Sequence, residues 1–354
     1  MRKEARTLLH QGAFIPAMPL VLRKDRSFDE KGQRRLIRYY LESGADGIAV
    51  GVHSTQFAIR EERIGLFEPV LRCAQEEIAA YRARTGREVL AIAGACGKTE
   101  QAVREAEQAV SWGYDAVLLS PGGLMEESEQ YLIDRHRQAA RVSPVIGFYL
   151  QPAVGGRLFS YDYWLKVCAT EGVEAVICAA FNRYCTLDVA RAIAESGRDV
   201  ALYTGNDDNI VADLLTVYRF SINGREARVP TVGGLLGHWG AWTHRAVEIF
   251  REIRALPENA PVPERLLSLA AQVTDVNGAF FDFRNQFRGC IAGIHEVLRR
   301  QGLMGGVWLL DEKEGLSPGQ KEEIDRVYRM YPDLNDDAFV AAFLQKDQAR
   351  EACI

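Results

Sequence analysis

Residues suited to chemistry stand directly after short apolar runs that are widely separated along the chain. They include two histidines, a tyrosine, a cysteine and two aspartates, with neutral polar groups and a tryptophan beside them: His53, Ser54, Thr55, Tyr149, Gln151, Cys178, Asn182, Asp207, Asp208, His238 and Trp239. Histidine, tyrosine and aspartate transfer protons, ionised cysteine is a nucleophile, and hydroxyl and amide groups orient a ligand by hydrogen bonds. Brought together, these side chains would form a polar pocket for a small molecule.

Several of these residues also have a purely structural interpretation. Tyr149 would pack in the core, and Cys178 would serve as a small buried apolar residue. Asp207 or Asp208 would cap a following helix, and His53 would be a solvated histidine at a rim. The residue types alone leave both interpretations open.

A divalent metal is a further alternative. His53, Asp207 and His238 offer nitrogen and oxygen ligands and would leave a coordination position open, so a bound ion would polarise a carbonyl group. However, the chain has no closely spaced ligand pair such as His-x-His. We therefore expect no metal and no other cofactor.

The elements that would position these residues follow a repeated pattern. A glycine, an acidic residue and an apolar run recur at residues 43–50, 112–119 and 171–178. Glycine adopts the left-handed conformation that ends a helix, and an uninterrupted apolar run is typical of a parallel strand covered on both faces. We predict eight strands with helices between them, at residues 14–18, 47–50, 89–93, 116–119, 145–149, 175–178, 200–203 and 231–236.

Eight strands alternating with helices over about 250 residues fit a closed (β/α)8 TIM barrel of the α/β class. We predict that residues 1–255 form the barrel. A doubly wound open sheet has the same alternation, but no Gly-x-Gly-x-x-Gly follows the first strand. Residues 221–229 resemble an extra hairpin that turns at Asn223-Gly224. After several prolines, residues 256–354 are expected to form a helical extension packed on the barrel.

Composition limits the partners and the compartment. The net charge is −5 and no basic run occurs, so we expect neither nucleic acid nor a membrane as partner. No apolar run is long enough to cross a bilayer. The seven cysteines are scattered without Cys-x-x-Cys spacing, which indicates free thiols in a reducing compartment. We expect a cytoplasmic protein.

Four stretches, in order along the chain, resemble motifs of the dihydrodipicolinate synthase/N-acetylneuraminate lyase family. Residues 12–19 resemble its opening strand, and residues 51–63 stand at its loop for the keto-acid carboxylate. The segment Tyr149-Leu-Gln-Pro152 resembles the segment that carries its catalytic tyrosine, and residues 203–208 resemble the segment after its seventh strand. The resemblance implies a TIM barrel with C-terminal helices, a lyase or aldolase activity on a small keto acid or sugar-derived acid, and a homodimer or homotetramer.

The family's Schiff-base lysine is missing from the aligned position, where Cys178 stands. None of the eight lysines of the chain falls within a predicted strand, and a Schiff-base lysine needs a buried or cation-flanked site that lowers its pKa. The resemblance then implies acid/base chemistry, and we expect Tyr149, Cys178 and His53 as the catalytic residues. The active site of such a barrel lies at the carboxyl ends of its strands, so we expect substrate to be held by the other polar and aromatic residues there: Ser54, Thr55, Gln151, Asn182, Asp207, Asp208, His238 and Trp239. A barrel that has lost its chemistry and only binds or regulates is the alternative.

Overall fold

The computed structural model describes residues 1–257 and 259–352. Its parallel strands close into a barrel in the order β1-β9-β7-β6-β5-β4-β3-β2, and the backbone N–H of Met18 joins β1 to β2 by donating to the Ala49 carbonyl at 2.9 Å. The barrel strands are β1 (Phe14–Pro16), β2 (Gly47–Val50), β3 (Leu90–Ala95), β4 (Ala116–Leu119), β5 (Val145–Leu150), β6 (Val173–Ala179), β7 (Ala201–Thr204) and β9 (Arg225–Leu236). The predicted (β/α)8 barrel is confirmed.

Alternate residues of the strands belong to two apolar clusters. The inner cluster fills the barrel and includes Ile146 and Ile177, whereas the outer cluster lies between the strands and the surrounding helices and includes Val145 and Val176. Successive side chains of a strand point to opposite faces. A strand buried on both faces therefore needs the continuous apolar runs seen in the sequence.

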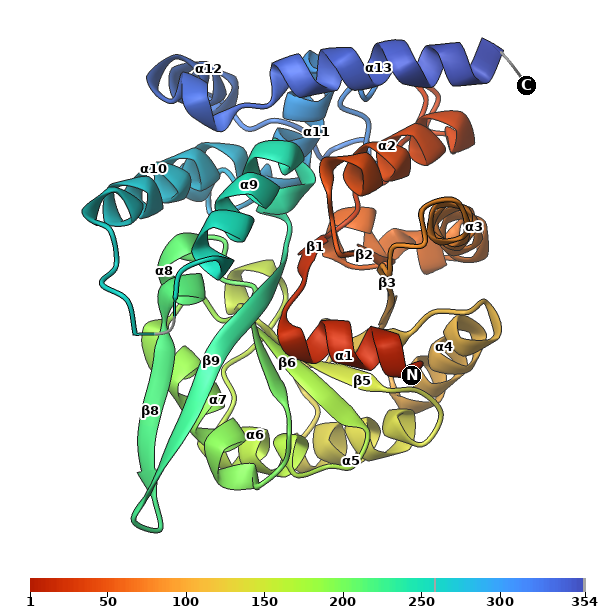
Figure 1. Cartoon of the computed structure of the whole chain (residues 1–354). Helices are drawn as coiled ribbons and strands as arrows, with labels where there is room; N and C mark the ends of the chain where they lie inside the picture. The colour runs from red at the N-terminus through yellow and green to blue at the C-terminus, as the bar shows by residue number, and fades with distance from the viewer. Residues whose placement is uncertain (258, 353–354) are drawn as a thin grey trace.

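Helices surround the barrel and connect its strands (Figure 1). Asp29 and Ser128 begin two of them by accepting hydrogen bonds from the backbone N–H groups of Gly32 and Tyr131. The helices are α2 (Glu30–Ser43), α3 (Phe67–Thr85), α4 (Thr99–Ser111), α5 (Glu129–Ala140), α6 (Tyr161–Cys168), α7 (Arg183–Ser196), α8 (Ile210–Leu215) and α9 (Thr243–Arg254). Short 3-10 turns are η1 (His53–Thr55), η2 (Phe57–Arg60), η3 (Pro152–Val154), η4 (His238–Gly240), η5 (Phe283–Asn285) and η6 (Pro332–Leu334).

Helix α1 (Lys3–Gln11) covers the end of the barrel at which the strands begin (Figure 1). Ala5 and Leu9 are fully buried in the inner cluster, and the Tyr203 hydroxyl donates to the Leu9 carbonyl at 2.7 Å. This end of the barrel is therefore closed by α1, and access to the barrel is left to the opposite end.

The predicted hairpin is confirmed. Strand β8 (Val217–Ile222) pairs antiparallel with the first half of β9, and the turn residues Asn223 and Gly224 have φ of 51° and 75°, the signs that a type I′ turn requires. Strand β9 begins earlier than expected because it continues from this hairpin into the barrel without a break.

The C-terminal extension lies over the end of the barrel at which the strands finish (Figure 1). Its Asp336 carboxylate accepts hydrogen bonds from the Tyr39 hydroxyl on α2 at 2.5 Å and from the Gln301 amide at 2.7 Å. The helices are α10 (Glu264–Phe280), α11 (Cys290–Arg300), α12 (Gln320–Met330) and α13 (Asp337–Ala352). Within the described chain, no helix is both long and apolar enough to span a membrane.

Candidate functional site

A cavity of about 90 Å³ lies between the ends of the barrel strands and the C-terminal extension. Four of the residues predicted for the site line it: His53, Ser54, Gln151 and Asp207. They follow β2, β5 and β7, where the carboxyl ends of parallel strands meet. Most of the remaining lining residues are apolar, so the cavity is a largely apolar pocket with a few polar groups.

His53 is held at the cavity by a tight turn after β2. The Thr55 hydroxyl accepts from the Gly51 backbone N–H at 3.0 Å and donates to the Met18 carbonyl at 2.7 Å, which ties the turn to the end of β1. Burial lowers the pKa of His53 to about 4, so its ring is neutral near pH 7. The ring meets Phe57 edge-on at 6.1 Å and has no hydrogen-bond partner among the described residues, which leaves its nitrogens available to a ligand.

Asp207 stands after β7 and is 6% exposed. One carboxyl oxygen, Oδ1, accepts a hydrogen bond from the backbone N–H of His238 at 2.8 Å. Burial is the main cause that raises the pKa of Asp207 to about 8; the Asp208 carboxylate adds to the rise and the bond from His238 opposes it. Near neutral pH, Asp207 is therefore mostly a carboxylic acid that can donate a proton.

Two neutral polar residues, Ser54 and Gln151, also line the cavity. The Ser54 hydroxyl donates to the Met18 carbonyl at 3.2 Å. The side-chain amide of Gln151 has no protein partner among the described residues, whereas the backbone carbonyl of Gln151 accepts from the Gly156 N–H at 3.0 Å. A Cβ on Gly156 would lie 1.8 Å from the Leu150 carbonyl oxygen, so the turn that presents Gln151 requires glycine there.

The expectation that Tyr149 and Cys178 face the cavity is wrong. The two residues are register partners on β5 and β6 and belong to the outer cluster, so both side chains point toward the helices. The Tyr149 hydroxyl accepts from the Phe159 N–H at 3.2 Å, and its ring stacks on Trp164 at 5.2 Å. Burial raises the pKa of Tyr149 well above its usual value.

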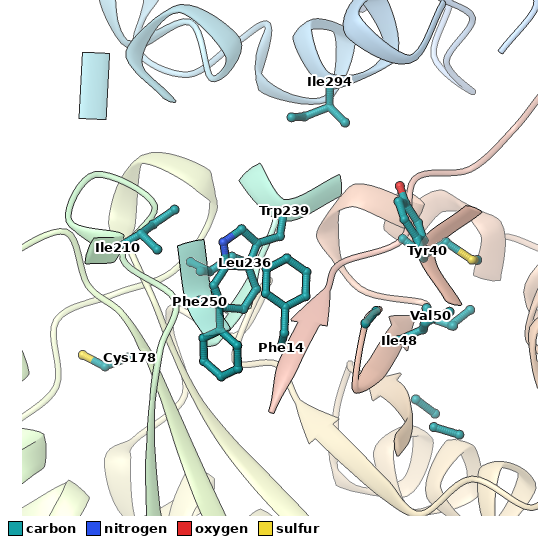
Figure 2. Close-up of a cluster of buried hydrophobic side chains, with 14 of the residues drawn as sticks. Phe14, Tyr40, Ile48, Val50, Cys178, Ile210, Leu236, Trp239, Phe250 and Ile294 are labelled. Carbon is teal, nitrogen blue, oxygen red and sulfur yellow. The ribbon is translucent and has the colours of Figure 1, made fainter. Parts of the chain in front are cut away.

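Cys178 has an equally structural environment. Its Sγ lies 3.6 Å from the Thr186 hydroxyl on α7, and burial raises the pKa of its thiol to about 12. Figure 2 draws it among buried apolar side chains. A thiol with so high a pKa is not a nucleophile near neutral pH. The cavity wall at the end of β6 is formed by the next residue, Ala179.

Thr55, Asn182 and Asp208 do not line the cavity either. Thr55 is fully buried in the turn that carries His53. Asn182 caps α7 by accepting from the Tyr184 N–H at 2.9 Å, and Asp208 pairs with Arg183 at 3.2 Å. These three side chains make local structural contacts, which neither the residue type nor the position on the barrel rim predicts.

His238 and Trp239 lie beside the cavity, in the packing around η4. Trp239 stacks on Phe14 with centroids 3.8 Å apart (Figure 2), and His238 stacks on Phe280 at 5.6 Å. Burial lowers the pKa of His238 to about 4. The side chain of His238 does not line the cavity, and the described residues contain no group of three or more His, Cys, Asp or Glu side chains arranged to hold a metal.

The sequence interpretation missed the apolar wall of the cavity. This wall comes from β5, from the loop after β6 and from the segment around α11: Phe148, Phe181, Phe281, Phe287, Cys290, Ile291 and Ile294. The extension residues have helical apolar spacing, which is typical of a core. The sequence does contain an indication of this wall: residues 281–289 form a short polar stretch between two helices, and this stretch nonetheless contains phenylalanines.

None of the eight lysines lines the cavity. Lys98, which follows β3 most closely, has a side chain that is 76% exposed and pairs with Glu127 at 3.6 Å. An amine so exposed lacks the desolvation that activates a Schiff-base lysine.

Comparisons with known proteins agree with this architecture. The family model described as the Dihydrodipicolinate synthetase family matches residues 11–218. The 4-hydroxy-tetrahydrodipicolinate synthase of Moorella thermoacetica is 26% identical over 275 residues, which cover 73% of this chain and 88% of that protein.

Solved structures show the same fold. Dihydrodipicolinate synthase from Oceanobacillus iheyensis superposes with a TM-score of 0.70 at 15% identity, covering 93% of this chain and 99% of its own. N-acetylneuraminate lyase from Fusobacterium nucleatum superposes with a TM-score of 0.70 at 17% identity, covering 91% and 99% of the two chains.

Proposed function

The chain belongs to the dihydrodipicolinate synthetase family, and we propose that it is a lyase that acts on a small carbonyl compound by acid/base chemistry, without a lysine Schiff base. Its relatives include a synthase and a lyase, as their names state. The observation that carries the proposal is that one largely apolar cavity is lined both by His53, whose ring has no hydrogen-bond partner among the described residues, and by the buried carboxyl of Asp207. The burial that lowers the pKa of His53 and raises that of Asp207 supports it.

The two groups suit opposite halves of a proton transfer. His53 takes a proton from the carbon next to the carbonyl group, while the Asp207 carboxylic acid donates its proton to the carbonyl oxygen. The products of this step are an enol, a histidinium and an aspartate, and the reverse step restores all three groups. Two titratable groups whose environments drive their pKa values apart commonly divide acid and base roles in this way.

The resemblance to the family favours a small keto acid or sugar-derived acid as substrate. The acid/base step itself requires only a carbonyl with a neighbouring C–H bond. Family resemblance also supports a homodimer or homotetramer, and the net charge of −5 and the scattered cysteines support a cytoplasmic protein without nucleic-acid or membrane partners.

The absence of a Schiff base is tested by incubating the protein with pyruvate and sodium borohydride and measuring its intact mass. We expect an unmodified mass, alongside a lysine-bearing family member that becomes labelled under the same conditions. A reduced pyruvyl adduct mapped to one lysine would contradict the proposal.

The acid/base activity is tested by proton NMR in D₂O. We expect the protein to exchange the methyl protons of pyruvate, acetone or acetophenone with solvent faster than buffer alone. If none of the three exchanges, while at least one binds, the protein is a binding or regulatory barrel and the proposed lyase function fails.

A further inference from the structure

The cavity contains no fixed positive charge. None of its lining residues is lysine or arginine, His53 is neutral near pH 7, and Asp207 is mostly protonated. The nearby Arg183 is engaged with Asp208 and Asp213 at 3.2 and 3.7 Å and does not line the cavity. A carboxylate that enters such a site loses its hydration and gains no counter-charge, which is strongly unfavourable.

Part of the cavity wall is aromatic. Phe148, Phe181, Phe281 and Phe287 line the cavity, and all four remain partly exposed although the neighbouring strand ends are buried. The rings of Phe181 and Phe287 meet edge to face, with centroids 5.7 Å apart and planes at 87°. Such rings offer faces and edges to a flat apolar group.

Two of these phenylalanines have a strained backbone. Phe181 has a φ of 51° and Phe287 a φ of 64°, a region that bulky residues rarely adopt. The Phe181 N–H donates to the Asn206 side-chain oxygen at 2.9 Å, and the Phe287 N–H donates to the Asp282 carbonyl at 3.0 Å. Strain held in place by specific hydrogen bonds commonly marks a functional position.

We infer that the cavity accepts a neutral carbonyl compound bearing a flat apolar group, such as an aryl ketone, in preference to a free keto-acid anion. The carbonyl lies toward His53 and Asp207, and the flat group lies among Phe148, Phe181 and Phe287. This inference rests on the proposed function, because it names the substrate class of the same cavity, and it replaces the keto acid that the family resemblance favours.

Isothermal titration calorimetry with a matched pair of ligands tests the charge preference. Acetophenone and benzoylformate are both phenyl ketones, and they differ in bearing a methyl group or a carboxylate beside the carbonyl. We expect acetophenone to bind about 100-fold more tightly than benzoylformate, the size that burial of an unpaired carboxylate implies. Equal or tighter binding of benzoylformate, or no binding of acetophenone, would overturn the inference.

Substitutions then test the aromatic wall. We expect Phe287→Ala and Phe181→Ala each to weaken acetophenone binding about tenfold. Phe283→Ala is the matched control, because Phe283 belongs to the same segment as Phe287, is 63% exposed and does not line the cavity. Phe287→Leu keeps apolar bulk without the ring and guards against a folding defect. Unchanged binding in both alanine variants would overturn the role of the wall.

The charge preference is also tested by adding a positive charge to the cavity. Val154 lines the cavity from η3 and is half-buried, so Val154→Arg places a guanidinium at its edge. We expect the preference to move toward benzoylformate by at least about tenfold, since arginine pairs with carboxylates. No movement in a folded variant would contradict the charge argument. These binding results are separate from proton exchange. Acetophenone binding without exchange of pyruvate, acetone or acetophenone rejects only the lyase function, whereas pyruvate exchange without acetophenone binding rejects only this inference.

Discussion

The two ends of the barrel handle charge in opposite ways. At the amino end, Arg2 pairs with Glu88 and Asp115 at 2.6 and 2.9 Å, and Arg6 and His10 both reach Glu174. At the carboxyl end, no lysine or arginine lines the cavity, and its titratable groups, His53, Asp207 and Cys290, are all mostly neutral near pH 7.

The backbone differs between the two ends as well. Near the cavity, the non-glycine residues Phe181, Phe287 and Gln56 have positive φ, whereas α1 at the opposite end is a regular helix whose one positive-φ terminus is a glycine, Gly12. Satisfied charges and relaxed backbone contribute to stability, whereas unpartnered polar groups and strained backbone oppose it. The contrast indicates that the amino end supports the fold and the carboxyl end carries the function.

The largest expected effect is the loss of proton exchange when the cavity's acid or base is removed. We expect His53→Gln and Asp207→Asn each to reduce the rate of methyl-proton exchange by about 100-fold or more, because a positioned acid or base commonly contributes that much. The rate is measured by proton NMR in D₂O. Asp188→Asn on α7 is the control, because its side chain is 41% exposed and does not line the cavity, and it should retain the full rate. Equal losses in all three variants would show that the losses do not come from the cavity's acid and base.

A core substitution at the amino end should reduce stability without altering ligand binding. Leu9 is fully buried in the inner cluster, so Leu9→Ala should lower the free energy of unfolding by about 3 kcal/mol. Urea denaturation measures the change, with Leu187→Ala, which removes a 44% exposed side chain, as the control. Acetophenone affinity should stay within twofold of the unaltered protein; a large drop would show that the two ends are coupled.

The pH dependence of stability should reveal the buried acid at the carboxyl end. The pKa of Asp207 is raised to about 8 in the folded protein and is about 4 in the unfolded chain, so between these values the folded state holds the extra proton. The contribution of Asp207 therefore favours folding at low pH. It falls progressively as pH rises from about 4, the pKa of the unfolded chain, and is lost once pH passes about 8, the pKa in the folded protein. As pH rises from 6 to 7, the free energy of unfolding of the Asp207→Asn variant should therefore increase by about 1 kcal/mol relative to that of the unaltered protein.

Urea denaturation at the two pH values measures this gain. Asp188→Asn should show no comparable pH-dependent difference from the unaltered protein. A constant difference between the Asp207→Asn variant and the unaltered protein would mean that Asp207 is ionised throughout and cannot act as the acid.

The smallest effect is expected from a single ion pair at the amino end. The Arg6 side chain is 46% exposed and pairs with Glu174 at 2.9 Å, and partly exposed pairs of this kind contribute little because solvent and salt screen them. Arg6→Ala should cost about 0.5 kcal/mol, measured by urea denaturation at low salt, and less at 1 M salt. A cost above about 2 kcal/mol would show that the network at this end acts as a unit.

The barrel and its hairpin were predictable because they depend on local patterns. Continuous apolar runs predict strands buried on both faces, and Asn223-Gly224 predicts the turn that the structure contains. The positions along the strands that reach the barrel rim were equally predictable: the structure brings His53, Ser54, Gln151 and Asp207 to the cavity.

The face of each strand was not predictable in the same way. Side chains alternate with a period of two, so an interpretation displaced by one residue exchanges the inside for the outside. Tyr149 and Cys178 are such a case, because Phe148, Leu150 and Ala179 face the cavity in their place. A run that is apolar at every position gives no indication of which face is which. The aromatic wall escaped prediction for another reason, since the extension meets the barrel only through the tertiary fold.

The placement of β9 has a consequence for how the chain assembles as it is synthesised. This strand lies between β1 and β7. β1, the first strand to be synthesised, therefore lacks one of its two neighbours until residues 225–236 have left the ribosome. Until then, β1 and β7 present unpaired backbone groups, which are templates for pairing with other chains. We therefore expect the nascent protein to aggregate most readily just before the hairpin emerges. Once β9 has been synthesised, it pairs with both β1 and β7 and covers these backbone groups.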